Sequence, residues 1–375
     1  MVGGGVTGLS AAWWLARSGV DVLVLEAGIV GFGASGRNGG GCTHGYSPLF
    51  HEEQRLWPMM DELLGYPTEF RPGRIRVAFD DDELELMRPM NEVAVAQGFR
   101  SEELDGDQIR QAAPLVGDNA IGGFFEHYGG HANPHRTVQG YAWAIQDHGG
   151  RVIQHTTVTG FDIAGGRVQS VHSSRGTLGC DQVVLAAGPR TGTLASALGV
   201  SVPLATARVE MIVTEPLALM PHGRVDGNGI YGRQTLRGNL AYGGGPHEWF
   251  DDGDPGGQRP GSSPLSRSIA RRVAELLPKA VHARVIRSWG GVVEVTPDGR
   301  PIIDYLEDPD NVVVATMSSL GFGLSPATGH AIQELVTTDR CSFTDLSTLG
   351  LSRFTEIDPQ WQSRQGWMRT AREHD

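Results

Sequence analysis

The chain has 375 residues, which is enough for a large hydrophobic core and two domains, and a net charge of −12 (31 basic, 43 acidic residues) argues against nucleic acid as a partner. No apolar run approaches the roughly 20 residues of a membrane helix, and a glycine-rich turn already begins at residue 3, so we expect no signal peptide, no membrane span and a cytoplasmic location. Three widely spaced cysteines without a CxxC pair predict neither a disulfide framework nor a metal site.

The first predicted unit is a strand, a glycine-rich turn, a helix and a second strand. Gly3, Gly5 and Gly8 have the G-x-G-x-x-G spacing that permits a tight turn, close approach of the backbone to a pyrophosphate, and helix packing on a sheet. The pattern predicts a helix over residues 9–18 and a strand over 21–25. Free N–H groups at the start of such a helix bind phosphate, so the unit predicts a dinucleotide site.

An acidic residue closes the second strand of this unit. Glu26 lies eighteen residues after Gly8, where a carboxylate can accept hydrogen bonds from an adenosine ribose. The same charge disfavours the 2′-phosphate of NADP. On these residues alone, NAD and FAD both satisfy the motif.

A glycine-rich loop follows over residues 29–45, and the chain then alternates helices and strands. We predict helices over 56–64, 81–97, 105–113 and 137–148, and a strand over 74–79. The cluster Asn133-Pro-His-Arg136 could suggest a metal site, but this pattern is more typical of a helix cap.

The second half of the chain is rich in predicted strands. They are expected over 151–155, 158–163, 167–173, 182–188 and 311–316, with a β-rich stretch over 204–242. A polar loop over 251–263 precedes a helix over 266–277, and another helix ends near 337. Lys279 is the single lysine, so Schiff-base chemistry lacks a candidate nucleophile.

With these segments in order, the chain resembles the FAD-dependent amine and amino-acid oxidoreductases of the D-amino-acid oxidase superfamily, a group that includes glycine oxidase, sarcosine oxidase and its β-subunit relatives, and γ-glutamylputrescine oxidase. Residues 33–40 (GASGRNGG) look like the second flavin loop, and Val158 matches the strand whose backbone meets the adenine. Ala186-Ala-Gly188 resembles the strand end beside the dinucleotide. Residues 289–301 resemble the WxG…TPDxxP return segment, and 321–329 the loop and helix start facing the flavin pyrimidine.

The resemblance implies an α/β fold: a Rossmann-like FAD-binding domain with an inserted, mainly antiparallel β-sheet substrate domain of α+β type. It assigns residues 1–72, 128–208 and 286–345 to the FAD-binding domain, 73–127 and 209–285 to the substrate domain, and 346–375 to a C-terminal extension. Motif and resemblance together predict cofactor contacts from Gly3, Gly4, Gly5, Val6, Thr7, Gly8, Glu26, Ala27, Ala34, Ser35, Arg37, Asn38, Gly39, Gly40, Val158, Ala187, Gly188, Gly291, Gly321, Phe322, Gly323, Leu324 and Ser325.

The sequence departs from the family pattern in ways that bear on the cofactor and its reoxidation. The first strand is reduced to Met1-Val2, from which we expect weaker FAD binding. Residues 290–294 contain no cysteine that could hold the flavin, so we expect noncovalent FAD. Ala241 and Gly323 stand where oxidases of this group place lysines, which puts fast reaction with oxygen in doubt.

The expected chemistry is hydride transfer from a substrate α-carbon to flavin N5, giving an imine that hydrolyses. Tyr231 and Arg233 are two apart on a predicted strand, so they share a face and can bind a carboxylate; an ion pair within the fold is an equally open interpretation of Arg233. His44 follows the flavin loop and can handle protons.

Three other interpretations are open at this point. A degenerate relative of this group would no longer bind FAD, because its first strand is short. An FAD-dependent 2-hydroxy-acid dehydrogenase would share the fold and the carboxylate anchor. A flavin-carrying β-subunit of a multimeric amine dehydrogenase would pass electrons to its partners. We expect a small-molecule amine or amino-acid substrate, with O2 or another electron acceptor, and either a partner subunit or a homo-oligomer.

Overall fold

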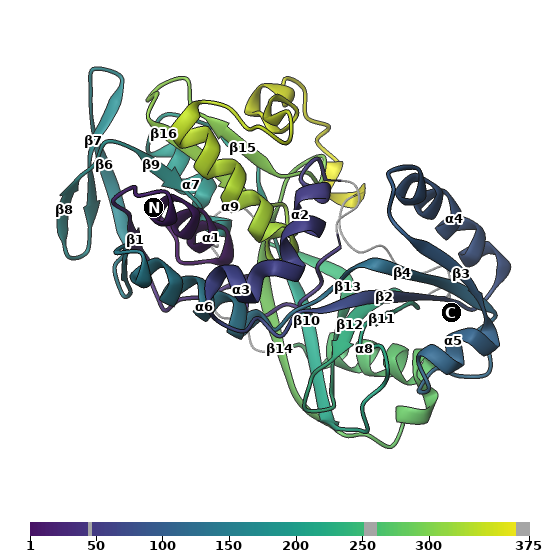
Figure 1. Cartoon of the computed structure of the whole chain (residues 1–375). Helices are drawn as coiled ribbons and strands as arrows, with labels where there is room; N and C mark the ends of the chain where they lie inside the picture. Colours follow the sequence, from purple (N-terminus) through teal and green to yellow (C-terminus); the bar gives the residue numbers. More distant parts are fainter. Residues whose placement is uncertain (44–46, 251–260, 365–375) are drawn as a thin grey trace.

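The computed structural model describes residues 1–43, 47–250 and 261–364 and divides into two bodies (Figure 1). In the first body, β1 (Leu23–Leu25) pairs in parallel with β5 (Arg151–Ile153), and β9 (Val183–Leu185) pairs in parallel with β16 (Val312–Thr316). The antiparallel strand β15 (Ile302–Tyr305) lies at the far side of β16.

Residue Val2 joins the two halves of this sheet. It forms parallel bridges with both Leu25 and Leu185, and its N–H and C=O groups bond to Val184 and Ala186. The first strand is therefore short, but it lies at the centre of a sheet with the order β5-β1-Val2-β9-β16-β15.

Helices cover this sheet. The helix α1 (Val6–Arg17) packs against α6 (Pro134–Asp147) and α9 (Gly321–Thr338), and all three contribute buried residues such as Trp13 and Tyr141. The shorter helices of this body are α2 (Phe50–Leu56), α3 (Met60–Leu64) and α7 (Thr191–Ser196). An antiparallel sheet of β6 (Val158–Ala164), β7 (Arg167–Ser173) and β8 (Gly176–Gly179) projects at the left of Figure 1.

The second body contains two four-stranded sheets around one apolar core. The first has the order β11-β2-β4-β3, and the second β12-β13-β10-β14. Their bounds are β2 (Arg71–Ala78), β3 (Ser101–Asp105), β4 (Gly122–His131), β10 (Ala205–Pro216), β11 (Val225–Asp226), β12 (Ile230–Gln234), β13 (Asn239–Phe250) and β14 (Val285–Val295). The helices α4 (Asp81–Ala96), α5 (Gly106–Ala112) and α8 (Ser263–Leu276) complete this body.

Most predicted elements are present, with shifted ends. The helix predicted over 137–148 begins at Pro134, because the Asn133 side chain caps it by accepting from the N–H groups of His135 and Arg136. The helix predicted over 56–64 is divided into α2, a 3-10 turn over Trp57–Met59 that contains Pro58, and α3. The polar loop predicted over 251–263 lies largely outside the described residues.

The strands β3, β4, β8, β14 and β15 were not anticipated. In β4 three glycines have positive φ angles, at Gly123, Gly129 and Gly130, so glycine interrupts the alternation that identifies a strand. The predicted domain bounds at 127, 208 and 286 fall within β4, β10 and β14, which run between the two bodies. The division into domains stays a prediction.

Candidate cofactor and substrate site

The turn between Val2 and α1 has room for backbone only. Gly3 has a φ of +110°, and a Cβ added there would lie 2.3 Å from the carbonyl oxygen of Ala186. A Cβ added at Gly8 would lie 2.2 Å from the oxygen of Gly3. Both positions therefore require glycine, as the sequence motif predicts for a turn that approaches a dinucleotide.

The N-termini of two helices meet at this turn. Gly5 is the N-cap of α1, and the N–H of Val6 donates to Ser35 Oγ at 2.9 Å. At the start of α9, a Cβ added to Gly321 would lie 3.3 Å from Thr7 Oγ1 in the first turn of α1. The positive ends of both helix dipoles thus face one region, which favours an anionic group.

The carboxylate of Glu26 is fixed at the end of β1. One oxygen accepts from the N–H of Gly4 and the other from the N–H of Gly28, each at 2.7 Å, with Ala27 between. The backbone N–H of Thr156 donates to the carbonyl oxygen of Glu26, which brings the start of β6 at Val158 near this carboxylate. The arrangement suits recognition of a ribose and an adjoining base.

The second glycine loop is held in shape by its own side chains. Asn38 Nδ2 donates to the oxygens of Ala34 and Ser35, and its Oδ1 accepts from the N–H of Gly40 at 2.7 Å. Arg37 donates to the oxygen of Gly290 on β14 at 3.3 Å.

The same loop is tied to β14 by a second contact. The indole of Trp289 donates to the carbonyl oxygen of Arg37 at 3.0 Å, and Gly291 lies against the Arg37 side chain. The loop and the return strand therefore form one surface, although about 250 residues separate them in the sequence.

The strand ends of the first sheet complete this region. After β9, Ala187 donates its N–H to Thr191 Oγ1, and Gly188 follows with a φ of +55°. A Cβ added at Gly188 would lie 3.6 Å from Glu294 Oε2. Burial raises the pKa of Glu294, whose other oxygen accepts from Met317 N–H.

The first turn of α9 is packed tightly. The indole of Trp57 donates to the oxygen of Gly323 at 2.7 Å and its ring lies 5.6 Å from that of Phe322. Leu324 is buried, and the carbonyl oxygen of Ser325 accepts from Ser10 Oγ at 2.6 Å. Packing therefore fixes the direction in which the N-terminus of α9 points.

On the substrate side, Tyr231 lies against Gly39 of the second glycine loop, and Arg233 lies against Gly40. A Cβ added at Gly39 would lie 3.3 Å from the Tyr231 ring, and one added at Gly40 would lie 2.6 Å from Arg233 Nη1. Arg233 donates to the Gly39 oxygen at 2.5 Å. Burial lowers the pKa of Arg233 to about 10, which still leaves a guanidinium cation at neutral pH. His44 lies outside the described residues.

Sequence reasoning missed two side chains beside this loop, Arg224 and His131. Arg224 donates to Thr43 Oγ1 at 3.1 Å and to the Gly130 oxygen at 2.5 Å, and it forms an ion pair with Asp226 at 3.2 Å. His131 is 4% exposed. The alternation H-G-R-V-D over 222–226 is the signal that could have identified Arg224.

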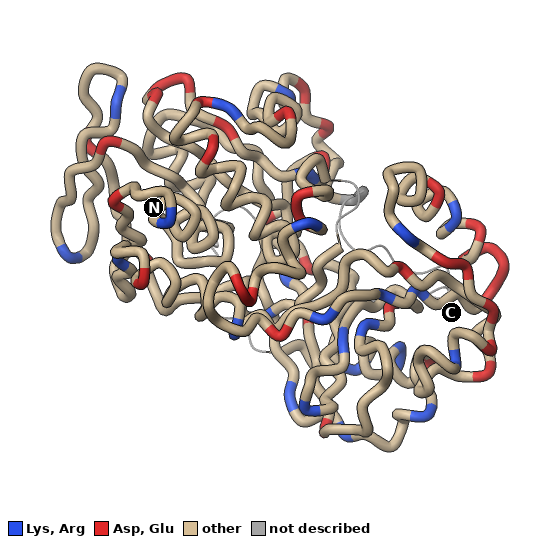
Figure 2. Tube along the Cα trace, in the orientation of Figure 1, with Lys and Arg blue, Asp and Glu red and all other residues tan. Residues whose placement is uncertain are grey.

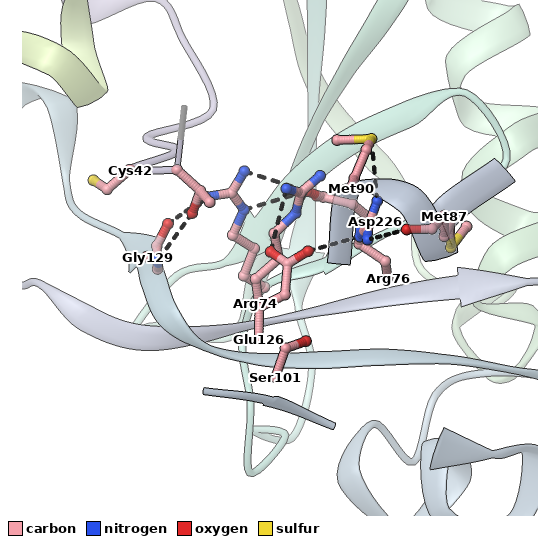
Figure 3. Close-up of polar contacts among 12 residues, drawn as sticks. Cys42, Arg74, Arg76, Met87, Met90, Ser101, Glu126, Gly129 and Asp226 are labelled. Atoms are coloured by element: carbon pink, nitrogen blue, oxygen red, sulfur yellow. Dashed lines mark hydrogen bonds and ion pairs between the residues drawn. The ribbon is translucent and has the colours of Figure 1, made fainter. Parts of the chain in front are cut away.

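Further ion pairs surround Arg224. Figure 3 shows Arg74, Glu126, Arg76 and Asp226 pointing toward one another, with the Cys42 thiol turned away from them. Figure 2 shows that basic residues gather on the strands of the second body.

Two kinds of site are absent from the part of the chain that the structure describes. No group of three His, Cys, Asp or Glu side chains there is arranged to hold a metal ion. None of its helices combines the length and apolar character that crossing a membrane requires.

Comparisons with known proteins agree with this geometry. The family model described as FAD dependent oxidoreductase matches residues 1–335. The beta subunit of sarcosine oxidase from Rhizobium meliloti is 28% identical over 90% of this chain and 83% of its own length, and gamma-glutamylputrescine oxidoreductase of Escherichia coli is 29% identical over 93% and 85%.

Solved structures show the same fold. L-proline dehydrogenase from P. horikoshii superposes with a TM-score of 0.85 at 21% identity and covers 95% of this chain and 98% of its own. Glycine oxidase from Bacillus cereus gives 0.85 at 22%, with the same coverage. With its Rossmann-type turn, second glycine loop and return strand in one place, the chain belongs to the FAD dependent oxidoreductase family, whose cofactor is FAD.

Proposed function

We propose that this protein oxidises a secondary amine or an amino acid with FAD as its cofactor. The observation that carries the proposal is Arg233, a buried guanidinium group lying directly against Gly39 and Gly40. It forms no ion pair with any carboxylate of the described ranges, so it is available to bind the carboxylate of a substrate.

The residues present fit FAD. The turn at Gly3 and Gly8 excludes side chains, two helix N-termini offer N–H groups to a pyrophosphate, and Glu26 can accept from a ribose. The second loop over 34–40 and Gly291 would lie along the rest of the cofactor, with no covalent link. Bound FAD supplies a two-electron acceptor at N5 for the hydride that leaves the substrate α-carbon, and the resulting imine is hydrolysed by water.

The chain's own residues would bind and orient the substrate. Arg233 would hold the carboxylate through paired hydrogen bonds, with the Tyr231 hydroxyl on the same strand face. The cationic groups of Arg233 and Arg224 disfavour a substrate ammonium and therefore favour the neutral amine, the form that can release hydride. The proposal needs no general base from the protein.

Anaerobic reduction of the bound flavin tests the proposal. Glycine, N-methyl amino acids, proline, opines and 2-hydroxy acids are added in turn, and loss of the visible flavin absorbance is recorded. We expect bleaching by at least one amine and none by hydroxy acids. Bleaching by 2-hydroxy acids alone would replace the proposal with a hydroxy-acid dehydrogenase.

A partner-dependent dehydrogenase is the second candidate. Several relatives are named as subunits, among them the beta subunit of sarcosine oxidase and one subunit of opine oxidase, both from Rhizobium meliloti, and this chain spans 83% and 90% of their lengths. Ala241 and Gly323 replace the oxygen-directed lysines of the oxidases that the chain resembles. This candidate predicts that flavin reduced by substrate stays reduced in air until an artificial acceptor is added; immediate reoxidation in air would contradict it.

A further inference from the structure

Two guanidinium groups lie against Gly40, the last residue of the second glycine loop, and Gly41, which follows it. A Cβ added at Gly40 would lie 2.6 Å from Arg233 Nη1, and one added at Gly41 would lie 3.0 Å from Arg224 Nη2. One arginine comes from β12 and the other directly precedes β11. One substrate carboxylate would not need the guanidinium groups of both Arg224 and Arg233.

Three arginines of this region share two carboxylates. Arg74, Arg76 and Arg224 share the carboxylates of Glu126 and Asp226, in ion pairs of 2.7 to 3.4 Å (Figure 3). Three guanidinium groups therefore face two carboxylates. Because removing a charge from water is costly unless it is paired, a buried cation without a carboxylate beside these shared pairs favours an anionic ligand.

Two further arginines lie outside these ion pairs. The Arg233 guanidinium donates to the carbonyl oxygen of Gly39, and Arg71 at the start of β2 is half-buried. Neither is in an ion pair with a carboxylate of the described residues. Among the described residues, Arg71 and Arg233 are therefore cations that a ligand could still pair with.

A neutral histidine adjoins these arginines. His131 is the register partner of Arg71 in the β2–β4 ladder, so their side chains share one face. Burial, aided by the charges of Arg233, Arg224 and Arg71, lowers the pKa of His131 well below its usual range. The Nδ1 atom of this buried ring has no hydrogen-bond partner among the described residues, which leaves its hydrogen-bonding capacity unused.

We propose that the substrate carries two carboxylates, one held by Arg233 and the second bound by Arg71 and His131. The inference rests on the proposed function and narrows it to N-carboxyalkyl amino acids and dicarboxylic amino acids, in preference to glycine, N-methylglycine or proline. Arg224 is fixed by Asp226, Thr43 and Gly130, so it supplies positive charge from a set position.

A binding measurement on the FAD-loaded protein tests this inference without turnover. Thiodiacetate has a sulfur in place of the amine nitrogen and two carboxylates, and its monoamide has the same shape with one charge fewer. Calorimetric titration should show that thiodiacetate binds at least about tenfold more tightly than the monoamide. Equal dissociation constants would overturn the proposal.

Matched variants locate the second carboxylate. Arg71→Met should weaken thiodiacetate binding by about tenfold and change monoamide binding by less than about twofold, while Arg71→Lys should restore part of the loss. Arg237→Met removes the same charge at an exposed position after β12 and should leave both affinities unchanged. Equal loss of both ligands in Arg71→Met, or the same selective loss in Arg237→Met, would contradict the assignment.

Turnover separates failure of this inference from failure of the proposed function. If iminodiacetate and N-methylglycine reduce the flavin with equal kcat/KM, the second carboxylate is unsupported while amine oxidation stands. If no amine reduces the flavin but thiodiacetate still binds tightly, amine oxidation is refuted, while the proposed site for two carboxylates is supported.

Discussion

At the scale of single residues, Arg233 has the clearest consequence. Replacement by methionine keeps the aliphatic stem and removes the charge that would hold a substrate carboxylate. We expect kcat/KM for amino acids to fall by about a hundredfold, since losing one partner of a buried charge pair costs roughly 2 to 5 kcal/mol. Steady-state kinetics measures this loss, and an amine without a carboxylate should be oxidised as well by the variant as by the wild type.

The same substitution leads to a second prediction, which concerns the stability of the protein without substrate. Arg233 is 8% exposed and has no carboxylate partner among the described residues, so its charge is buried at a cost. The melting temperature of Arg233→Met without substrate should therefore equal or exceed that of the wild type. A large decrease would show that this arginine stabilises the fold.

Sequence reasoning reached Tyr231 and Arg233 because two residues on one strand face are a local pattern. It did not reach the ion pairs of Arg74, since Asp226 is 152 positions away and Glu126 lies on a strand whose glycines concealed it. Contacts of this kind depend on how strands pair, which local periodicity does not encode.

At the scale of elements, the turn before α1 offers a variant that separates folding from cofactor binding. A Cβ added at Gly5 meets only Ser35 Oγ, at 3.2 Å, and the φ of −75° suits alanine. Gly5→Ala should therefore fold, yet weaken FAD binding by about tenfold, because the methyl group would occupy the space in which a pyrophosphate approaches. Quenching of FAD fluorescence measures the affinity, with Gly179→Ala at the remote strand β8 as the control.

A second prediction concerns the contact between α2 and α9, where Glu52 lies beside His330. Burial opposes ionisation of Glu52, but hydrogen bonds from Arg55 and from His330 outweigh it and lower the pKa of Glu52 to about 2. A depressed carboxyl pKa stabilises the fold above the unfolded value of 4.5, and this contribution is lost as the pH falls toward 2. Because solvent screens part of these interactions, its size is roughly 2 to 3 kcal/mol.

Urea denaturation of Glu52→Gln checks this linkage. The variant should be less stable than the wild type by roughly 2 kcal/mol at pH 7, and the difference should shrink below about pH 4.5. Glu62→Gln, at an exposed position of α3, should differ from the wild type by less than about 0.5 kcal/mol at any pH. A gap for Glu52→Gln that is constant with pH would exclude the ionised carboxylate as its cause.

At the scale of the whole molecule, the cofactor region draws on segments from both ends of the chain: the α1 turn, the second loop, β14 and α9. Ligand binding to the folded state alone should therefore stabilise both bodies, by about 2.7 kcal/mol at a hundredfold excess over Kd. We expect FAD to raise the melting temperature by several degrees and NADP to leave it unchanged. Calorimetry with each nucleotide distinguishes the two, and stabilisation by NADP would contradict the role of Glu26.

Much of the architecture could be predicted from the sequence because its first 26 residues form a complete local unit. The strands β3, β4, β8, β14 and β15 were not predicted because they are short or interrupted by glycine. The close approach of Gly3 to Ala186, and of Thr7 to Gly321, could be expected only from the family resemblance. The weaker FAD binding expected from the short first strand stays a prediction.

The position of Val2 at the centre of the first sheet has a consequence for how the molecule opens. The N–H groups of Gly3 and Leu25 form the hydrogen bonds between this residue's segment and β1, and those of Val2 and Ala186 form the bonds to the β9 side. A fluctuation that parts β1 from β9 can break the bonds on either side of Val2, so each pair of amide protons should exchange with deuterated solvent in its own opening event. Because Gly3 also begins the cofactor turn, bound FAD should slow amide hydrogen exchange at Leu25 and Ala186 as well. Cofactor binding would thus stabilise the central hydrogen bonds of the first sheet.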